Sequence, residues 1–487
     1  MSNRGGYRPN SGRKKAQHPK KKVQIYVDED LEKRINSIKV IQAKSFSSKI
    51  CTLISKGIES MVEEDKNVIR FADLFAGVGG IRLGFERALK KHGLNGKTVF
   101  VSEIKKSAIT VYKDNFGHEE ITGDITKVNE EDVPDLDYIL AGFPCQAFST
   151  AGKQLGFEDT RGTLFFDVAR IIKAKKPKGF LLENVEGLTT HDHGKTFKVI
   201  TNTLHELGYS IAYKVLNSAD FGLAQNRKRI YIIGNRFGDE MSLDQLSDNN
   251  YPKVSLSEII EKDIPPVKDD FATKLLSHYS LSEVEGKQIK DKRGGVNNIH
   301  SWDFELKGPV SREQKELLEM LLRQRRNKKW ADVIGIDWMD GMPLTAKMIS
   351  TFYSHPDLKN MLDDLVQKGY LSYEYPKAKV GNRRIPDETK EKGYNIVAGK
   401  LSFEYTKILS PDAPTPTLVA TDMSHLGVPV AGGIRPLTTR EGLRLFGYPE
   451  TYSLDSVTKP KAYDLLGNTV AVNAIEAVAN VLLDATE

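Results

Sequence analysis

The feature that most constrains the fold is an alternation of short apolar segments with amphipathic segments between Val68 and about Arg236. We predict strands at the apolar segments and helices at the longer stretches between them. The predicted strands are Val68–Leu74, Thr98–Ser102, Tyr138–Ala141, Gly179–Glu183 and Arg229–Gly234. Strands that alternate with helices favour an α/β fold, in which a parallel sheet is covered by helices on both faces.

The chain is too long for one compact core, because 487 residues usually fold as about two to four domains. Composition and charge change along the sequence and predict five segments. These are a basic arm at 1–22, a β-α-α module at 23–64, a catalytic domain at 68–236, a polar and interrupted region at 237–433, and a regular, partly apolar segment at 434–487.

Residues 1–22 carry eight lysines and arginines and no acidic residue. A segment of this composition cannot bury itself, so we predict a disordered arm. Two roles stay open for it, a solvated tail and an arm that contacts nucleic-acid phosphates. The formal net charge of the whole chain is only +6, so the distribution of charge is more informative than its total.

Residues 23–64 are predicted to form one strand and two helices. Val23–Val27 alternates in the manner of a strand, and Asp28–Asp30 begins the first helix. Ser45 or Ser47 caps the second helix. So short a segment buries little surface alone.

This module resembles a ribbon-helix-helix DNA-binding unit, in which two chains pair their strands and place the ribbon in the major groove. The resemblance implies a homodimer and makes Gln24 and Tyr26, or their neighbours in the opposite strand phase, the residues that face DNA. Cys51 fits the buried side of the second helix and is predicted to be a core residue. A hairpin that serves only dimerisation or docking is the alternative.

The chain has two cysteines, Cys51 and Cys145, which are too few and too far apart for a disulfide framework or a cysteine metal site. No metal site is predicted. No apolar run approaches the ~20 residues that span a bilayer, and the N-terminus lacks the apolar stretch of a secretory signal. We therefore expect a cytoplasmic protein with reduced thiols and no membrane contact.

The first predicted strand ends in a glycine-rich turn, Asp73–Gly80, which reads Asp-Leu-Phe-Ala-Gly-Val-Gly-Gly. Glycines let the backbone turn tightly and approach a ligand at the carboxyl edge of the sheet, where open α/β folds bind cofactors. Glu103 ends the next strand, where a carboxylate can hold two ribose hydroxyls. A dinucleotide-dependent dehydrogenase would begin in the same way, and a surface carboxylate is the alternative for Glu103.

A lone thiol follows the third predicted strand in Gly142–Ser149, which reads Gly-Phe-Pro-Cys-Gln-Ala-Phe-Ser. Cys145 is a candidate nucleophile there, although an isolated cysteine is more often a buried apolar residue. Glu183 ends a later apolar strand, where burial raises a carboxyl pKa and suits the group to acid catalysis. Gln225–Arg229 adds guanidinium groups just before another apolar strand.

With these residues the sequence resembles the cytosine-5 DNA methyltransferase family, whose motifs occur here in the family's order over roughly 220 residues. The matching blocks are Asp73–Gly80, Glu103, Gly123–Ile125, Pro144–Gln146, Asp159–Phe165, Glu183–Val185, Gln225–Arg229, Arg435–Glu441, Leu445–Pro449 and Gly467–Val470. Two positions depart from the family pattern: Ile104 stands where an aromatic residue often stacks on adenine, and Thr469 replaces a serine.

The resemblance implies a Rossmann-like methyltransferase domain that binds S-adenosylmethionine, with 237–433 as a target recognition domain and 434–487 completing the catalytic domain. It makes Cys145 the nucleophile that attacks carbon 6 of a cytosine flipped out of duplex DNA. Glu183 would hold or protonate ring nitrogen 3. The other implied catalytic residues are Arg229, Arg227, Asn184 and Pro144. The implied cofactor-binding residues are Asp73, Phe75, Gly77, Gly79, Gly80, Glu103, Ile104, Asp124, Ile125 and Asn468.

Target recognition is assigned to the polar region, 237–433. The residues expected to contact DNA are Gln146, Ser149, Arg323, Arg325 and Thr417, with Gln24 and Tyr26 in the N-terminal module. The basic cluster Arg323–Lys329 suits phosphate contacts, and a solvated helix face is its alternative. Thr345–Ser354, Asp357–Lys368 and Tyr370–Tyr375 have a helix-helix-strand pattern, which predicts a winged helix.

The family resemblance implies methylation of carbon 5 of cytosine in a specific double-stranded DNA sequence. In the commonest setting such methylation protects host DNA in a restriction-modification system, and a cognate restriction endonuclease would act on the same site without needing to contact this chain. Two alternatives are an RNA cytosine-5 methyltransferase, whose recognition region is usually much shorter, and a transcriptional regulator that binds DNA through residues 1–64.

Overall fold

The structure is a computed structural model that describes most of the chain. The described residues are 29–37, 46, 49–54, 67–117, 120–144, 164–247, 251–292, 294–381, 383–398 and 403–486. The chain divides into two units, Met1–Val68 and Ile69–Glu487. The division falls at the residue where the catalytic domain was predicted to begin, and the finer domain boundaries stay predictions.

The first unit contains helix α1 (Glu29–Ser37) and a helical segment at 49–54, both where helices were predicted. The predicted strand with Gln24 and Tyr26 lies outside the described residues, as does the basic arm. The predicted burial of Cys51 is wrong for the single chain, because this side chain is exposed. Ile35 is the one buried hydrophobic side chain among the described residues of this unit, and so small a unit has little apolar surface to cover a thiol.

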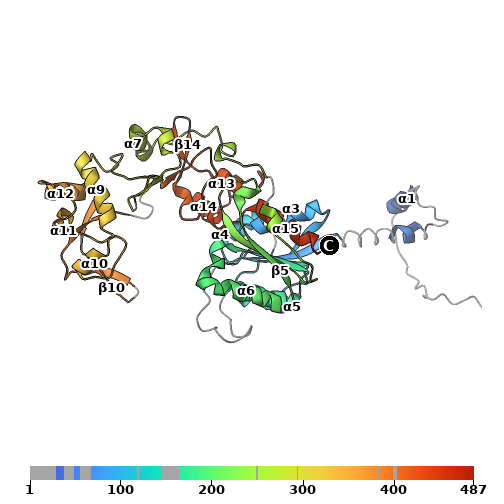
Figure 1. Ribbon diagram of the computed structural model, residues 1–487. Coiled ribbons are helices and arrows are strands. Elements are labelled where there is room, and N and C mark those ends of the chain that lie inside the picture. Colours follow the sequence, from blue (N-terminus) through green and yellow to red (C-terminus); the bar gives the residue numbers. More distant parts are fainter. Residues whose placement is uncertain are drawn as a thin grey trace, which may run out of the picture. The chain divides into compact units, whose positions relative to one another are not determined.

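The second unit is built on a six-stranded sheet in the order β2-β1-β3-β4-β6-β5 (Figure 1). The strands are β1 (Val68–Leu74), β2 (Asn95–Ser102), β3 (Tyr138–Ala141), β4 (Gly179–Val185), β5 (Ser210–Asn217) and β6 (Lys228–Asn235). β1, β3 and β4 are parallel, with Phe71 beside Tyr138 and Tyr138 beside Gly179. The carboxyl ends of these three strands therefore meet at one edge, as an α/β ligand site requires.

The prediction of a parallel sheet is right for the centre and wrong at one side. β6 runs antiparallel to both β4 and β5, and β5 was not among the predicted strands. Only ten residues, 218–227, connect β5 to β6. A parallel crossover needs a dozen or more residues, usually including a helix, so this short connection permits only an antiparallel return.

Helices cover both faces of the sheet. Successive strand residues point to opposite faces, so each face contributes its own side chains to a separate core. On one face, Phe71 and Leu140 pack in a core with helices α3 (Gly80–Lys91) and α15 (Val472–Asp484). On the other face, Ala72 and Ile139 pack with α5 (Leu164–Lys175) and α6 (Lys195–Glu206). α4 (Lys106–Phe116) follows β2 and packs through Ala108 and Val111 against the C-terminal segment.

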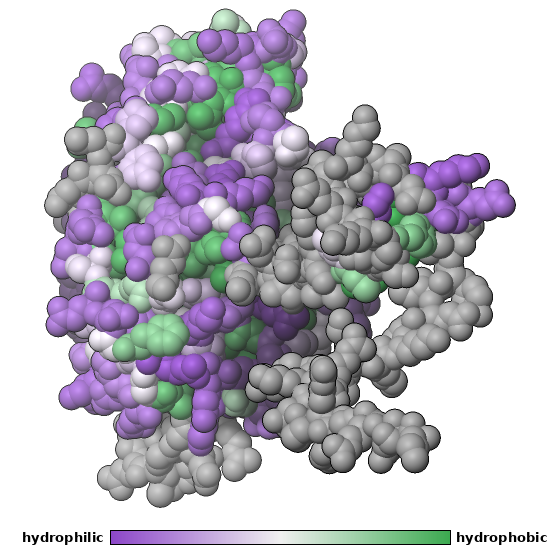
Figure 2. Space-filling view, turned by 90° about the vertical axis from the view of Figure 1, so that its right-hand side faces the viewer, coloured by the Kyte–Doolittle hydropathy of each residue, from purple (hydrophilic) through white to green (hydrophobic). Residues whose placement is uncertain are grey.

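The C-terminal segment returns to this sheet after the long polar region. It contains α13 (Thr439–Leu445), α14 (Lys459–Asn468) and α15. Arg435 and Glu441 form a fully buried ion pair at its start, with Nη2 and Oε1 2.6 Å apart. Lys459–Asp484 is long and apolar enough to span a membrane by composition, but 78% of its apolar window is buried inside the unit. This stretch is therefore part of the core. On the face of the molecule that Figure 2 shows, apolar residues lie in small groups among hydrophilic ones.

Part of the polar region forms a second sheet of five strands in the order β15-β14-β13-β7-β8. Its strands are β7 (Gln288–Ile289), β8 (Asn298–Ile299), β13 (Lys407–Ile408), β14 (Leu426–Val430) and β15 (Gly433–Pro436). Helices α7 (Asp270–His278) and α8 (Leu281–Val284) share its apolar core, which includes Phe271, Val284 and Phe304. Short 3-10 helices occupy Ile125–Lys127, Glu130–Asp132, Glu186–Thr189, His191–Gly194, Ser218–Phe221, Asp244–Ser247, Leu256–Glu258 and Met423–His425.

Residues 310–397, here called the inserted module, share an apolar core that also includes Trp302. The module contains α9 (Arg312–Gln324), α10 (Lys329–Ile334), α11 (Ala346–Ser350), α12 (Leu358–Gln367), β9 (Leu371–Glu374), β10 (Lys377–Val380), β11 (Arg383–Pro386) and β12 (Gly393–Ile396). The predicted helix-helix-strand pattern is confirmed by α11, α12 and β9.

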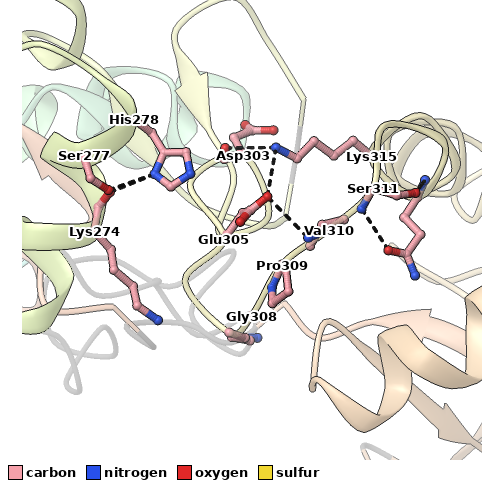
Figure 3. A network of polar contacts seen from close by, with 12 residues as sticks. Lys274, Ser277, His278, Asp303, Glu305, Gly308, Pro309, Val310, Ser311 and Lys315 are labelled. Atoms are coloured by element: carbon pink, nitrogen blue, oxygen red, sulfur yellow. Dashed lines mark hydrogen bonds and ion pairs between the residues drawn. The ribbon is translucent and has the colours of Figure 1, made fainter.

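The inserted module is joined to the preceding strands by polar contacts around residues 303–315 (Figure 3). Lys315 of α9 donates to the carbonyl of Asp303 at 3.3 Å and lies 3.9 Å from the carboxylate of Glu305. The backbone N–H of Val310 donates to the same carboxylate at 3.4 Å. These contacts fix the path of the chain where it enters the module.

Candidate active site

The glycine-rich turn follows β1 directly and leads into α3. Phe75, Gly77 and Gly79 all have positive φ angles, of 55°, 55° and 72°. Gly80 cannot carry a side chain without a collision, because a Cβ there would lie 2.6 Å from the hydroxyl of Tyr448 and 2.8 Å from Val470. The turn therefore brings bare backbone to the carboxyl edge of the sheet, against the C-terminal segment.

Glu103, just after β2, is fixed against this turn by three backbone donors. The N–H of Gly77 donates to Oε2 at 2.8 Å, and the N–H groups of Ile104 and Lys105 donate to Oε1 at 2.8 and 2.7 Å. The carboxylate is thus oriented before any ligand is present. Ile104 beside it is 71% exposed, so its side chain is free to cover a ligand.

A cavity of about 470 Å³ opens at this edge of the sheet. Its lining includes the predicted residues Phe75, Gly77, Gly80, Glu103, Ile104, Asp124, Ile125, Pro144, Glu183, Asn184, Arg227, Arg229 and Asn468. The cofactor turn and the predicted catalytic residues therefore face one space, although they come from segments far apart in the sequence. Asp124 also caps the following 3-10 helix, accepting from the N–H and hydroxyl of Thr126.

Two predicted cofactor residues, Asp73 and Gly79, do not line the cavity. Asp73 is buried behind it and accepts a hydrogen bond from the hydroxyl of Tyr112 at 3.1 Å. Burial raises the pKa of Asp73 to about 8, against the opposing effect of Arg82. Asp73 therefore acts on the site through packing, and Gly79 through its backbone conformation.

Glu183 and Arg229 form the charged centre of the cavity. The Nε of Arg229 lies 3.1 Å from Oε1 of Glu183, and β4 and β6 place the two side chains on adjacent antiparallel strands. Burial raises the pKa of Glu183, while Arg229 and Arg227 act in the opposite direction. A carboxyl of this kind can hold a proton at higher pH than an exposed glutamate, which suits it to donate a hydrogen bond or a proton.

Arg227, one of the implied catalytic residues, makes its hydrogen bonds within the protein. It is buried, and its guanidinium donates to the carbonyls of Leu418, Gly467 and Thr469 at 2.9, 3.4 and 2.6 Å. Burial lowers its pKa to about 10, so it stays charged at neutral pH. These bonds make it a positioning residue that ties the C-terminal segment to the floor of the cavity.

The segment that carries the candidate nucleophile is described as far as Pro144, which lines the cavity. Cys145, Gln146 and Ser149 lie outside the described residues. Asn184 donates from Nδ2 to the carbonyl of Phe143 at 2.8 Å, and its Oδ1 accepts from the N–H of Val185. Asn184 thus fixes the backbone just before Pro144.

The described residues that were predicted to contact DNA differ in their exposure to solvent. The prediction for Arg325 is wrong, because its side chain is buried and donates to Oδ1 of Asn395 at 2.8 Å. Arg323 is exposed at the end of α9. Thr417 is exposed beside the cavity and donates to the carbonyl of Asn226 at 2.7 Å.

Sequence reasoning missed parts of the cavity wall. Lys105 forms an ion pair with Asp464 of α14, and this pair joins the end of β2 to the C-terminal segment at the rim. Leu465 adds apolar wall from the same helix. The helical phase of α14 before Gly467 would have pointed to Leu465, but no local motif marks the ion pair. Among the described residues there is no group of three or more His, Cys, Asp or Glu side chains that could hold a metal ion.

A family model, described as C-5 cytosine-specific DNA methylase, matches residues 69–484. The chain belongs to this family. It is similar to the Type II methyltransferase M.NlaIV of Neisseria lactamica, with 59% identity over 85% of this chain and 99% of the relative. M.NgoBV of Neisseria gonorrhoeae is 57% identical with the same coverage, and M.HgiCI of Herpetosiphon aurantiacus is 42% identical over 84% of this chain and 97% of the relative.

The family assignment settles the reaction. The protein is a DNA cytosine-5 methyltransferase with S-adenosylmethionine as methyl donor. The catalytic sheet and its helices are those of a Rossmann-like methyltransferase. The RNA methyltransferase and regulator alternatives are not favoured as the main function.

The cavity residues fit S-adenosylmethionine. A volume of about 470 Å³ lies within the range of cofactor sites. The bare backbone at Gly77 gives a ligand room to approach, because a Cβ there would meet only the carbonyl of Phe75 at 3.9 Å, and the oriented carboxylate of Glu103 suits two ribose hydroxyls. Ile104 and Ile125 offer apolar surface to an adenine ring, with Ile104 in place of an aromatic stacking partner.

Proposed function

We propose that Cys145 is the nucleophile and Glu183 the proton or hydrogen-bond donor in methylation of a cytosine within a specific double-stranded DNA sequence. The observation that carries this proposal is the buried Glu183–Arg229 pair on the wall of the cavity that the cofactor turn also lines. The raised pKa of Glu183 and the position of Pro144 directly before Cys145 support the same assignment.

The chemistry follows from the weak nucleophilicity of carbon 5 of cytosine. Attack of the Cys145 thiolate on carbon 6 converts the ring to an enamine whose carbon 5 is nucleophilic. Glu183 donates to ring nitrogen 3 as negative charge develops there, and Arg229 holds the Glu183 carboxyl in place. Bound S-adenosylmethionine supplies the electrophilic methyl group. Loss of the proton from carbon 5 then expels the thiolate and restores the ring.

The target cytosine has to leave the duplex, because both faces of its ring are covered by stacking. We assign the reading of the surrounding sequence to residues 237–433 and completion of the catalytic domain to 434–487. The bonds from Arg227 to Leu418, Gly467 and Thr469 support this assignment, because they tie both segments to the catalytic domain just before β6 begins.

The direct test is Cys145→Ala with Cys51→Ala as its control. We expect the first variant to lose methyl transfer from labelled cofactor while it still binds DNA and cofactor. Cys51 lies in the other unit, and its substitution should leave turnover unchanged. Turnover by Cys145→Ala at a rate near that of the unchanged protein would overturn the assignment. Bisulfite sequencing of DNA from cells that express the protein would identify the modified cytosine and its sequence context.

The biological role we propose is protection of host DNA in a restriction-modification system. The relatives named Type II methyltransferases support this role. A cognate endonuclease would recognise the same sequence without contacting this chain. DNA from expressing cells should resist an endonuclease that cuts at the sequence found by bisulfite sequencing, and full cleavage would contradict the role.

We further propose that residues 1–64 form a ribbon-helix-helix-like module that pairs two chains and binds the promoter of the protein's own gene. The basic arm and the two helical segments support it. Deletion of residues 1–64 should convert a dimer to a monomer in sedimentation and raise promoter output. Unchanged sedimentation and promoter output would remove both parts of this proposal.

A further inference from the structure

The inserted module has the connectivity of a winged helix. Helices α9 and α10 come first, then an extended residue, Leu344, then α11 and α12, and then β9. Leu344 and Tyr394 of β12 exchange backbone hydrogen bonds of 3.0 and 2.8 Å, and β9 pairs with β12, so the module holds a small antiparallel sheet. The β10–β11 hairpin connects β9 to β12 in the position of the wing.

Close packing maintains this small sheet. A Cβ on Gly393 would lie 2.7 Å from the backbone nitrogen of Leu344, so only glycine permits the two backbones to approach. The buried Arg325 donates to the side chain of Asn395 and the carbonyl of Ile396 in β12. The module is therefore a defined fold, and the hairpin extends from a fixed base.

The hairpin is strongly basic and carries no acidic residue. Residues 377–386 read Lys-Ala-Lys-Val-Gly-Asn-Arg-Arg-Ile-Pro, with four basic side chains. Lys379 and Arg384 lie directly opposite each other in the ladder, an arrangement of like charges that destabilises a strand pair. Neither Lys379 nor Arg383 has a hydrogen-bond or ion-pair partner among the described residues, and both are exposed. The free protein thus holds cations together without their counter-charges.

The hairpin is largely exposed, with Lys377 and Ala378 of β10 only partly buried. All four residues of β11 are exposed, including Ile385 at 47%. Its attachment is through Arg384, which donates to the carbonyls of Asp337 and Trp338 at 3.4 and 3.0 Å. Trp338 in turn donates from Nε1 to the carbonyl of Arg326 at 2.9 Å, which brings the second basic segment, 326–329, close to the base of the hairpin.

The exposed cations of this hairpin suit it to bind the phosphates of DNA. We propose that the β10–β11 hairpin is a wing that inserts tip first into a groove of the substrate duplex and contacts phosphates on both walls. Successive residues of each strand point to opposite faces, and paired residues share a face, so Lys377, Lys379 and Arg384 point to one face and Arg383 to the other. A ribbon lying flat in a groove would need basic side chains on one face only.

The exposed face of α12 is less suited to hold the backbone of DNA. Its exposed charged residues, Lys359 and Asp363, form an ion pair of 2.8 Å, and Asp363 also accepts from the hydroxyl of Tyr394. The charge of this helix is thus neutralised within the module, whereas that of the hairpin is not. This contrast selects the hairpin over the helix as the phosphate-contacting element.

The inference rests on duplex DNA as the substrate, and its test reads binding alone, so it can fail while methyl transfer by Cys145 stands. The test compares the full chain with the double variant Lys379→Ala/Arg383→Ala, by fluorescence anisotropy with a random-sequence duplex of about 40 base pairs over a range of KCl concentrations. We expect affinity to fall about tenfold at ~0.1 M salt and the slope of log K against log salt to become shallower by about 2.

The control removes two cations from exposed helical positions of the same module. Arg312→Ala/Lys359→Ala has the same change in net charge, and both residues pair with acids on their own helices. We expect its salt slope to be unchanged. The charge-conserving variant Lys379→Arg/Arg383→Lys should restore the slope of the unchanged protein. An unchanged slope in Lys379→Ala/Arg383→Ala, or an equal loss in the control, would overturn the proposal.

Discussion

The Nε of Arg229 lies 3.1 Å from Oε1 of Glu183, in a pair whose side chains are only 13% and 9% exposed. Truncating Glu183 would leave the buried donor of Arg229 without an acceptor, whereas an amide of the same shape removes the ionisable proton and keeps an oxygen that accepts from Arg229. The pair therefore allows the catalytic role of Glu183 to be separated from its structural role.

Glu183→Gln should reduce kcat by about a hundredfold or more, the usual loss when a general acid is removed. Cofactor binding should persist, because the amide keeps the volume of the side chain and accepts from Arg229. Single-turnover methyl transfer and calorimetric titration with cofactor measure the two quantities. Glu186→Gln is the matched control, because Glu186 is exposed and lies 4.0 Å from Lys228 just outside the pair; its turnover should be normal.

Replacement of Arg229 should shift the pH dependence of turnover. Its positive charge lowers the pKa of Glu183 against the larger effect of burial. In Arg229→Leu the pKa of Glu183 should rise further, so its protonated form should persist to higher pH. The alkaline limb of the pH profile of kcat should therefore shift to higher pH. Arg229→Lys keeps the charge and should leave the limb near its original position. A limb that does not move in the leucine variant would show that Glu183 does not control it.

Arg227→Ala should lower stability and weaken cofactor binding together. It removes the donor to three buried carbonyls, those of Leu418, Gly467 and Thr469, and the expected loss in the free energy of unfolding is about 2–4 kcal/mol. Urea unfolding measures this loss, and a raised Kd for the cofactor would follow because Gly467 and Thr469 line the cavity. A fall in kcat with stability and cofactor affinity unchanged would instead place Arg227 at the reacting base.

Asp73 should make stability depend on pH in the direction opposite to an ordinary carboxylate. Its pKa is about 8 in the folded chain, against a reference value of 3.8. Between these values the folded state holds one more proton than the unfolded state, so the free energy of unfolding falls as pH rises, by up to about 1.4 kcal/mol per pH unit. Asp73→Asn should flatten this slope in urea unfolding between about pH 5 and 8.

The control for this slope is Asp244→Asn. Asp244 is exposed, and its hydrogen bond from Lys214 lowers its pKa, so it titrates below the window in both states. The slope between these pH values should be the same in this variant as in the unchanged protein. Equal slopes in the Asp73 variant and the unchanged protein would mean that Asp73 stays ionised in the folded chain.

Local patterns predicted the centre of the sheet well. β1 and β3 occupy the predicted residues, because β3 is a continuous apolar run and β1 is mostly apolar and buried, as expected of central strands. β5 at the edge was missed, since its half-buried residues include Lys214 and Asn217 and lack such a run. The antiparallel direction of β6 depends on the length of the connection before it. The apolar pattern of a strand gives no information about its direction.

The chemical type of the site residues was easier to predict than their burial. Glu183 lies where an acid ending an apolar strand should lie, and its pKa is raised as expected. Arg227 and Arg325 carry positive charges that suggested contacts with a ligand, but each is buried and donates hydrogen bonds within the protein. Their partners come from segments about 70 to 240 residues away, so no local signal distinguishes them from the exposed arginines beside them.

Gly467→Ala should unfold or severely weaken the C-terminal segment, although alanine normally stabilises a helix by up to about 1 kcal/mol relative to glycine. Gly467 lies in α14, where an added Cβ would collide with the backbone of Ala420 and lie 2.7 Å from the carbonyl carbon of Val419. Backbone cannot move aside as a flexible side chain can, so the gain in helix propensity is lost to steric strain. Gly123→Ala is the control near the same edge of the sheet, because a Cβ there meets nothing within 4 Å. The midpoint of thermal unfolding should fall in Gly467→Ala and stay unchanged in Gly123→Ala. Equal stability of the two variants would show that the backbone around Ala420 can move to accommodate the Cβ.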